Sequence, residues 1–333
     1  MAKLRLGVIG AGSWAVASHL PNLEKHADNV EFVAVSRLGR EPLERIRKRF
    51  GFQLVSEDYH DVINAGIDIC VVSSPAGLHY EHARAALEAG AHVLIEKPVT
   101  IDPAQAWELV ETAQRLNRHM LVSFGWNYKP IVREARRMMT MDGGIRKIEQ
   151  LTIAMSSKTR ELLLNTGAYP AAAPDSLPEA ATWIDPRLSG GGYGQAQLSH
   201  ALGLALWLTG LRGKDVFALM SAPLDAPVEL HDAIVLRYDN GAIGTLAGGS
   251  AHLGANNGKD QLEVRAIGAE GQFQIDLDRK VAWRFRIDSK NSRFTSEPNS
   301  ARYDCIGPID TLVELALGHD VENCSPIELG AYR

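Results

Sequence analysis

The chain has 333 residues, 45% of them hydrophobic and 23% charged, a composition typical of soluble globular proteins and sufficient for two domains. The net charge is −5 and no dense basic run is present, so the sequence gives no electrostatic reason to propose a nucleic acid or an anionic membrane as partner. No apolar stretch is long enough to span a bilayer, and no secretory signal precedes the first strand, so a cytoplasmic protein is expected. The three cysteines, Cys70, Cys305 and Cys324, are widely spaced and predict neither disulfides nor a zinc site.

The first 124 residues alternate short apolar runs with segments of helical length. Strands are expected at residues 4–9, 31–36, 67–73, 92–95 and 120–124. Helices are expected between them at residues 14–26, 42–50, 79–89 and 103–116. Strand–helix alternation with almost continuously apolar strands predicts a doubly wound parallel sheet, covered by helices on both faces.

After residue 124 the pattern changes, and a second domain is expected over residues 125–333. Helices are expected at residues 131–139 and 195–208, and strands at 148–155, 216–221, 233–238, 242–247, 261–267, 271–276 and 281–286. Asp239-Asn240-Gly241 predicts a hairpin turn, because Asn and Gly tolerate positive φ. This rhythm indicates an α+β domain with one mainly antiparallel sheet. The long Pro-, Ala- and Gly-rich stretch at residues 156–192 is of a kind that usually has a function.

A glycine-rich turn directly follows the first strand and opens the first helix. Its first glycine permits a tight turn, its second lets the backbone approach a pyrophosphate, and the helix N-terminus attracts the phosphate charge. The turn therefore predicts a dinucleotide site, with a glycine turn that binds nothing as the alternative. The expected contacts are Gly10, Ala11, Gly12, Ser13 and Trp14.

The end of the second strand indicates which nicotinamide cofactor is bound. NAD-specific sites place Asp or Glu there, about 20 residues past the glycines, to hold the ribose 2′-hydroxyl. This chain has Ser36 and Arg37 instead, with Arg40 three residues on. A serine can hydrogen-bond a 2′-phosphate and an arginine can pair with it bidentately, so NADP(H) is the predicted cofactor. The alternative is that Arg37 is a surface residue and that NAD is accepted as well.

The segment SSPAGLHYEHARAALEAGAHVLIEKPVT at residues 73–100 resembles the glucose–fructose oxidoreductase/inositol dehydrogenase/MocA (Gfo/Idh/MocA) family. That family has a similar Pro-x-x-x-His, a helix ending Ala-Leu-x-Ala-Gly, and a Glu-Lys-Pro triplet after a strand. Further matches are Trp183-Ile184-Asp185-Pro186, Gly190-Gly191-Gly192 with His200, and the hairpin at residues 240–246. The resemblance covers essentially the whole chain. It implies a Rossmann domain, then an open-faced sheet domain, with the substrate between them and copies associating through the exposed sheet face.

The resemblance also implies roles for particular residues. Lys97 would act at the substrate oxygen, as proton relay or hydrogen-bond donor, since a desolvated lysine beside a cationic ring can have a pKa near neutrality. The alternative for Lys97 is a structural salt bridge to Glu96. A cis Lys97–Pro98 bond would fit the resemblance. Cofactor contacts are expected from Ser73, Ser74, Pro75, His79, Glu96, Lys97 and Asn127.

The sequence departs from the family at the site helix. The family places an aspartate four residues before the histidine, and this chain has Ala196 there. Gln197 lies on nearly the same helix face and could contact substrate, but it cannot act as a carboxylate base. Three roles stay open for His200: general acid/base, hydrogen-bond partner of the substrate, or packed core histidine. The family also has a last helix after the element at residues 325–330, where only three residues follow here.

The remaining substrate contacts are expected around the long loop and the last strand of the first domain. Tyr128 lies where family members reach the nicotinamide or the substrate. Trp183 and Arg160 would belong to a lid over the site, and the alternative is a solvated loop with a core tryptophan. No Cys, His or Asp cluster has metal-ligand spacing, so no metal is expected.

Together these features predict an oxidoreductase that transfers a hydride between a nicotinamide cofactor and a sugar, sugar derivative or cyclitol. Lys97 and His200 are the expected catalytic residues. One alternative is an enzyme that oxidises its substrate transiently and retains its cofactor, as epimerases and some glycosidases do. Another is a non-catalytic dinucleotide-binding sensor, supported by Ala196 and opposed by the retention of Lys97.

Overall fold

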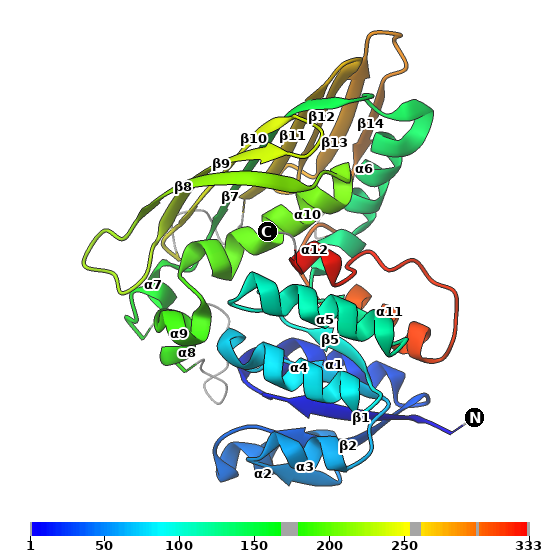
Figure 1. Ribbon diagram of the computed structural model, residues 1–333, viewed down its shortest axis with the longest axis vertical. Helices are drawn as coiled ribbons and strands as arrows, with labels where there is room; N and C mark the ends of the chain where they lie inside the picture. The colour runs from blue at the N-terminus through cyan, green and yellow to red at the C-terminus, as the bar shows by residue number, and fades with distance from the viewer. Residues whose placement is uncertain (1, 168–178, 254–260, 298–299, 332–333) are drawn as a thin grey trace.

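The computed structural model describes residues 2–167, 179–253, 261–297 and 300–331. Two sheets with their helices form two parts of the molecule, one above the other in Figure 1. Within the described ranges, no helix combines the length and the apolar character needed to cross a membrane.

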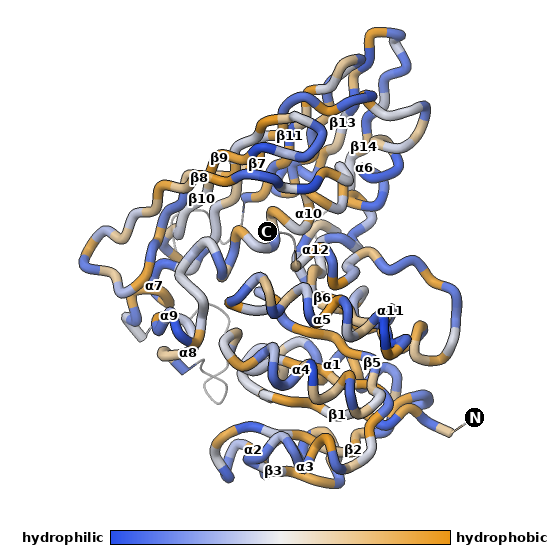
Figure 2. The backbone as a smooth tube through the Cα atoms, viewed as in Figure 1, coloured by the Kyte–Doolittle hydropathy of each residue, from blue (hydrophilic) through white to orange (hydrophobic). Residues whose placement is uncertain are grey.

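The first part contains a six-stranded sheet in the order β3-β2-β1-β4-β5-β6, and every neighbouring pair is parallel. Its apolar strands are buried on both faces, and the hydrophobic run along β5 is visible in Figure 2. This arrangement confirms the predicted doubly wound parallel sheet. The strands are β1 (Leu4–Ile9), β2 (Val30–Ser36), β3 (Leu54–Ser56), β4 (Ile69–Val72), β5 (His92–Ile95) and β6 (Met120–Val122).

Helices cover the sheet on both faces (Figure 1). They are α1 (Leu20–Leu23), α2 (Arg40–Phe50), α3 (Tyr59–Asn64), α4 (His79–Glu88) and α5 (Pro103–Arg115). Local sequence sets their ends: before α5, the Asp102 carboxylate accepts a hydrogen bond from the Ala104 amide, and Pro103 has no amide to satisfy. The sequence pattern does not predict β3 or α3, because both are too short to show a period.

The helix expected over residues 14–26 is divided into three short pieces. A π-helical turn at Ala15–His19 precedes α1, and a 3-10 turn follows at Glu24–His26. Pro21 has no amide hydrogen, so the regular hydrogen-bond pattern cannot run through it, and the wider turn lies just before it.

The second part is an eight-stranded sheet in the order β14-β13-β12-β11-β7-β10-β9-β8, antiparallel except for the β7–β10 pair. One face packs against α6 (Pro130–Thr140) and α10 (Ser199–Thr209), and no described helix covers the other (Figure 1). The mainly antiparallel, open-faced sheet and the β9–β10 hairpin are therefore confirmed. The strands are β7 (Ile148–Ser157), β8 (Gly213–Ser221), β9 (His231–Tyr238), β10 (Ile243–Ser250), β11 (Gln261–Gly268), β12 (Gly271–Asp276), β13 (Val281–Arg286) and β14 (Ser292–Thr295).

After β14 the chain returns to the first sheet. Helix α11 (Ile306–Ala316) packs on one face of that sheet, where Ile309, Leu312 and Val313 belong to the same buried cluster as the side chains of β1. His26 hydrogen-bonds Asp310 at 2.8 Å and ties α11 to the first part. The last helix, α12 (Glu328–Ala331), contacts α5 and α10, so residues far apart in sequence join the two parts.

Candidate functional site

The glycine turn lies at the carboxyl ends of β1 and β4, where dinucleotides bind in open parallel sheets. Gly10 has φ +81°, and a Cβ there would overlap the backbone of Ser74, so the two loops touch. At Gly12 the nearest atom to an added Cβ is the Gly10 oxygen, 3.9 Å away, which leaves open space on that side. The turn thus combines close backbone packing with an open surface at a helix start, and it fits a pyrophosphate.

Ser36 and Arg37 lie beside this turn. The Ser36 carbonyl accepts hydrogen bonds from the Gly10 and Ala11 amides, and Ser36 as a whole is only 3% exposed. The Arg37 guanidinium lies along the turn and donates to the Ala11 oxygen at 3.2 Å. Burial and the nearby charge of Arg45 lower the pKa of Arg37, and Glu179 opposes this. Arg45, on α2, thus adds a positive charge that the sequence reasoning missed, whereas Arg40 is exposed at the start of that helix.

The loops after β4 and β5 are joined by His79. Its Nδ1 lies 2.8 Å from the Pro98 oxygen and its Nε2 lies 2.7 Å from the Ser74 oxygen. His79, which was expected to contact the cofactor, is buried, and each ring nitrogen lies within hydrogen-bond distance of a main-chain carbonyl, of which a neutral ring can donate to one. Its place is to hold together the loops that carry Ser73, Ser74 and Pro75 on one side and Lys97 on the other. The Lys97–Pro98 peptide is cis.

Lys97 extends from the end of β5 toward the second part of the molecule. Its Nζ donates to the main-chain oxygen of Ala196 at 2.7 Å and lies 5.8 Å from the centre of the Trp183 ring. Burial lowers the pKa of Lys97, although Glu96 and Cys305 act in the opposite direction. The alternative of a structural salt bridge to Glu96 is not what the structure shows, since the ammonium bonds a neutral carbonyl.

The Glu96 carboxylate is occupied by other partners. Its Oε1 hydrogen-bonds His19 Nε2 at 2.8 Å, and its Oε2 accepts from the Lys97 amide at 3.2 Å. Burial would raise the pKa of Glu96, but the His19 hydrogen bond and the charges of His19 and Lys97 outweigh it and lower the pKa to about 2. Glu96 is therefore ionised, and its carboxylate holds the main chain at Lys97 through the Lys97 amide.

Cys305 completes a buried group with His19 and Glu96, whose possible ligand atoms all lie within 4.8 Å of one another. Burial raises the pKa of the Cys305 thiol to about 11, so the thiol is protonated near neutral pH and is a weak metal ligand. His19 and Glu96 are already bonded to each other. The chemistry of this donor set thus favours a hydrogen-bonded cluster over a metal centre.

His200 lies on α10 inside a ring of aromatic side chains. Its ring centre is 4.9 Å from Tyr303, 5.3 Å from Trp126 and 6.1 Å from Phe124, each in edge-to-face geometry. Burial and then the charge of Lys97 lower the pKa of His200 well below its usual value. His200 is therefore neutral near pH 7. The sequence did not point to Trp126 and Tyr303, because both are far from His200 along the chain and only the folded structure brings them together.

The helix expected at residues 195–208 begins with a π-helical turn at Gly194–Leu198, before α10. In this turn the Ser199 amide bonds the Gly194 oxygen, five residues back. Ala196 is buried, and its oxygen is the one that meets Lys97. Gln197 is half-buried within the same turn. At this position, where the resemblance implies an aspartate in relatives, Ala196 has no carboxylate, and its main-chain oxygen contacts Lys97.

In the described parts of the long loop, residues 156–167 and 179–192, lie the short helices α7 (Arg160–Leu163), α8 (Ala181–Ile184) and α9 (Pro186–Ser189). Helix α9 rests on the loop after β4, at Gly77, where a side chain would overlap the Arg187 oxygen. Trp183 lies on the preceding helix, α8, near Lys97. The Arg160 guanidinium donates a long hydrogen bond, 3.5 Å, to the Ser250 oxygen. Residues 168–178 of the expected lid lie outside the described residues.

Asn127 and Tyr128, which were expected to reach the nicotinamide or the substrate, bond the C-terminal segment. Asn127 is fully buried and its Nδ2 donates to the Cys324 oxygen at 2.8 Å. The Tyr128 hydroxyl bonds Ser325 Oγ at 2.9 Å. Both side chains hold the returning C-terminal segment against the first part, which was expected of neither.

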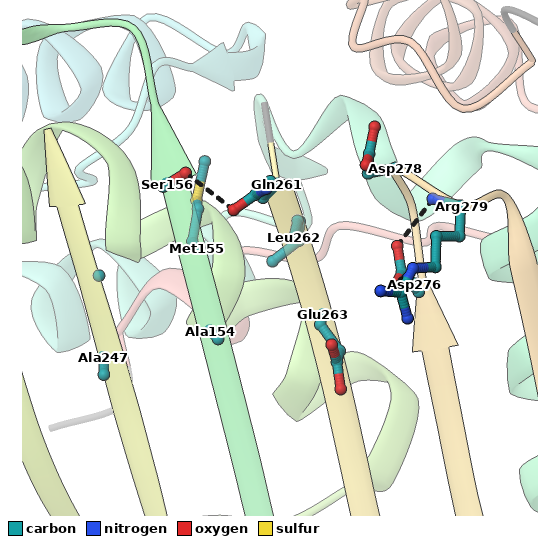
Figure 3. Close-up of a pocket in the computed structure, with 11 residues that line it drawn as sticks. Ala154, Met155, Ser156, Ala247, Gln261, Leu262, Glu263, Asp276, Asp278 and Arg279 are labelled. Atoms are coloured by element: carbon teal, nitrogen blue, oxygen red, sulfur yellow. Dashed lines mark hydrogen bonds and ion pairs between the residues drawn. The ribbon is translucent and has the colours of Figure 1, made fainter. Parts of the chain in front are cut away.

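A hollow on the open face of the second sheet lies elsewhere (Figure 3). Its floor contains the small residues Ala154 and Ala247, and Glu263, Asp276 and Arg279 lie beside it. Because α10 packs on the opposite face of the sheet, this hollow is not part of the group around Lys97.

Comparison with known proteins gave two family matches, which together span more than half of the chain. Residues 4–124 match the oxidoreductase family with an NAD-binding Rossmann fold, and residues 161–274 match the GFO/IDH/MocA C-terminal domain. Levoglucosan dehydrogenase in complex with NADH and levoglucosan shares the fold, with a TM-score of 0.76 at 20% identity, over 99% of this chain and 94% of that one.

Two curated relatives are similar over part of their length. The D-glucoside 3-dehydrogenase of Escherichia coli is 33% identical over 140 residues, which is 42% of this chain and 40% of that protein. The inositol 2-dehydrogenase/D-chiro-inositol 3-dehydrogenase of Lactiplantibacillus plantarum is 31% identical over 146 residues, 43% of this chain and 41% of that protein. The matches thus span less than half the length of these two relatives.

Proposed function

Because the chain belongs to the Gfo/Idh/MocA oxidoreductase family, we propose that it is an NADP(H)-dependent enzyme acting on a carbinol group of a sugar, sugar derivative or cyclitol. The observation that carries this proposal is the position of Lys97. It follows the strand next to β4, at the sheet edge that carries the glycine turn, and its ammonium faces the helix of the second part. The two relatives described above, an inositol dehydrogenase and a glucoside dehydrogenase, support a polyhydroxylated substrate.

The cofactor, when bound, supplies or accepts a hydride. Lys97 manages the accompanying proton: in the oxidation direction its neutral amine accepts the proton of the substrate hydroxyl. Burial favours this neutral form, and the Ala196 oxygen orients Nζ without adding a negative charge. His200 is neutral among its aromatic neighbours and serves as a hydrogen-bond partner of the substrate rather than as the proton acceptor.

The preference for NADP(H) rests on Arg37 and Arg45. Burial and then the charge of Arg45, which also pairs with Glu41 at 2.6 Å, lower the pKa of Arg37, and a 2′-phosphate beside Arg37 would offset both effects. We also propose that copies associate through the open sheet face, where Phe217 and Leu219 are each 65% exposed.

A panel of sugars and cyclitols with NADP⁺, followed at the absorbance band of the reduced nicotinamide, tests the activity. Turnover of none of them by a protein that binds NADPH would contradict it.

Replacement of Ala196 tests the part played by a neutral partner. An Ala196→Asp variant is expected to raise the pKa of Lys97 by about 1–3 units, because a carboxylate beside the ammonium favours its charged form. Since oxidation requires the neutral amine, the rising limb of kcat/KM against pH should move to higher pH by the same amount. Initial rates across the pH range measure this, with Ala196→Asn as the uncharged control. A limb that stays in place would argue against Lys97 as the proton acceptor.

The proposed role of His200 predicts a modest effect. A His200→Ala variant should lose about 10-fold in kcat/KM, the value of one hydrogen bond, and far less than a variant at Lys97. Steady-state kinetics on both variants, with Gln197→Ala for comparison, provide the measurement. Equal losses at His200 and Lys97, together with wild-type behaviour of Gln197→Ala, would make this assignment wrong.

A further inference from the structure

Glu229 precedes β9 and reaches back to the triple glycine, 37 residues away in sequence. Its Oε1 accepts hydrogen bonds from the Gly192 amide at 2.7 Å and from the Gly194 amide at 3.3 Å. Its main-chain oxygen accepts from the Tyr193 amide at 3.0 Å. Three consecutive amides at the start of a helix, groups that need an acceptor from outside it, are thus all satisfied by one residue.

The fit around Glu229 is close. A Cβ added at Gly192 would overlap the Glu229 main-chain oxygen, so only glycine allows this approach. The Ala196 amide then bonds the Gly192 oxygen at 2.9 Å, and the Ala196 oxygen accepts from Lys97 at 2.7 Å. A short chain of contacts therefore runs from the Glu229 carboxylate, through the turn at residues 192–196, to Nζ of Lys97.

We propose that Glu229 is a positioning residue for Lys97: it holds the turn whose Ala196 carbonyl fixes the lysine ammonium. Its effect on turnover rests on the proposed function, whereas its hold on the turn does not. The π-helical turn is wider than a regular helix at the point where the Ala196 oxygen reaches Lys97. In this proposal, the hydrogen bonds from Glu229 hold the turn in that wider form. An error of about 1 Å in such a placement can cost about 100-fold in rate.

Asp232 provides a matched control beside Glu229. It is 4% exposed, and neither carboxyl oxygen has a hydrogen-bond partner among the described residues. Burial and the charge of Glu229 raise the pKa of Asp232 to about 6. Asp232 therefore shares the location and the charge type of Glu229 but makes no bond to the turn. An Asp232→Asn variant changes the local charge without removing the anchor.

Amide hydrogen exchange, read by mass spectrometry on peptides that cover residues 190–200, tests the anchor without any activity. In Glu229→Ala the Gly192 and Gly194 amides should exchange at least about 10-fold faster, because they lose their acceptor. Glu229→Gln should behave like the wild type, since the amide oxygen can accept the same bonds. Unchanged exchange in Glu229→Ala, or equal acceleration in Asp232→Asn, would overturn the proposal.

The kinetic test uses the same variants of the full chain. Glu229→Ala should lose about 10- to 100-fold in kcat with unchanged affinity for NADPH, while Glu229→Gln keeps most of its turnover. If the alanine variant does not fold, Glu229→Asp, which keeps the charge but is one methylene shorter, should show a smaller loss in the same direction. Wild-type turnover in Glu229→Ala beside an inactive Lys97→Met variant would overturn only this inference. Normal turnover in Lys97→Met would instead refute the proposed function.

Discussion

A Lys97→Met variant is expected to lose about 10²- to 10⁴-fold in kcat, the usual contribution of a positioned acid–base group. Methionine keeps the length and apolar stem of the side chain but cannot carry the proton or bond the Ala196 oxygen. Because the glycine turn is untouched, the affinity for NADPH should change little. Steady-state kinetics and fluorescence titration of NADPH measure the two quantities separately.

The control for this variant is Lys214→Met, which removes a lysine from the exposed edge strand β8. Its kinetics should match the wild type. Near-normal turnover in Lys97→Met would refute the assigned role. A matched loss of NADPH affinity would mean that Lys97 acts mainly in binding the cofactor.

The second large effect concerns cofactor choice. A Ser36→Asp/Arg37→Ala double variant should shift the ratio of NADP to NAD affinity by about 100-fold or more toward NAD. The introduced carboxylate repels a 2′-phosphate and can accept from a ribose 2′-hydroxyl, and the lost guanidinium removes charge-assisted hydrogen bonds worth about 1.5–3 kcal/mol. Dissociation constants for both cofactors at one moderate salt concentration give the ratio.

Arg47→Ala is the matched control. Arg47 is exposed on α2, the helix that also carries Arg45, and its charge is not among those that shift the pKa of Arg37. It should leave the ratio unchanged. A wild-type protein that binds NAD as tightly as NADP would contradict the predicted preference.

The architecture could be predicted where the pattern is local. The strands at residues 4–9 and 92–95 are continuous apolar runs, and the structure has them at the predicted bounds. Family membership and the two-sheet fold are likewise confirmed. The sequence pattern did not predict helix α11, because Gly307 and Pro308 near its start are poor helix formers. The helix is stabilised by packing against the first sheet, whose strands come from the first 122 residues of the chain.

The candidate site was predictable only in part. The resemblance drew attention to Lys97, Trp183 and His200, and the structure places Lys97 near Trp183. It could not indicate that Ala196 contributes its carbonyl, because a π-helical turn depends on partners far away in sequence. Glu229 is such a partner, and no local pattern marks it. Whether these residues act as assigned, and where the two domains divide, remain predictions.

The most direct test follows a hydride rather than a rate. A sugar or cyclitol that the protein turns over is labelled with deuterium at the oxidised carbon and incubated with the protein and NADP⁺. Mass spectrometry then measures the deuterium content of the cofactor and of the sugar. The account predicts that the reduced cofactor gains the deuterium in proportion to the substrate oxidised, and that Lys97→Met nearly abolishes this transfer. Return of the deuterium to the sugar without net reduction of the cofactor, with solvent exchange of a hydrogen on the neighbouring carbon, would contradict it and would favour transient oxidation with a retained cofactor.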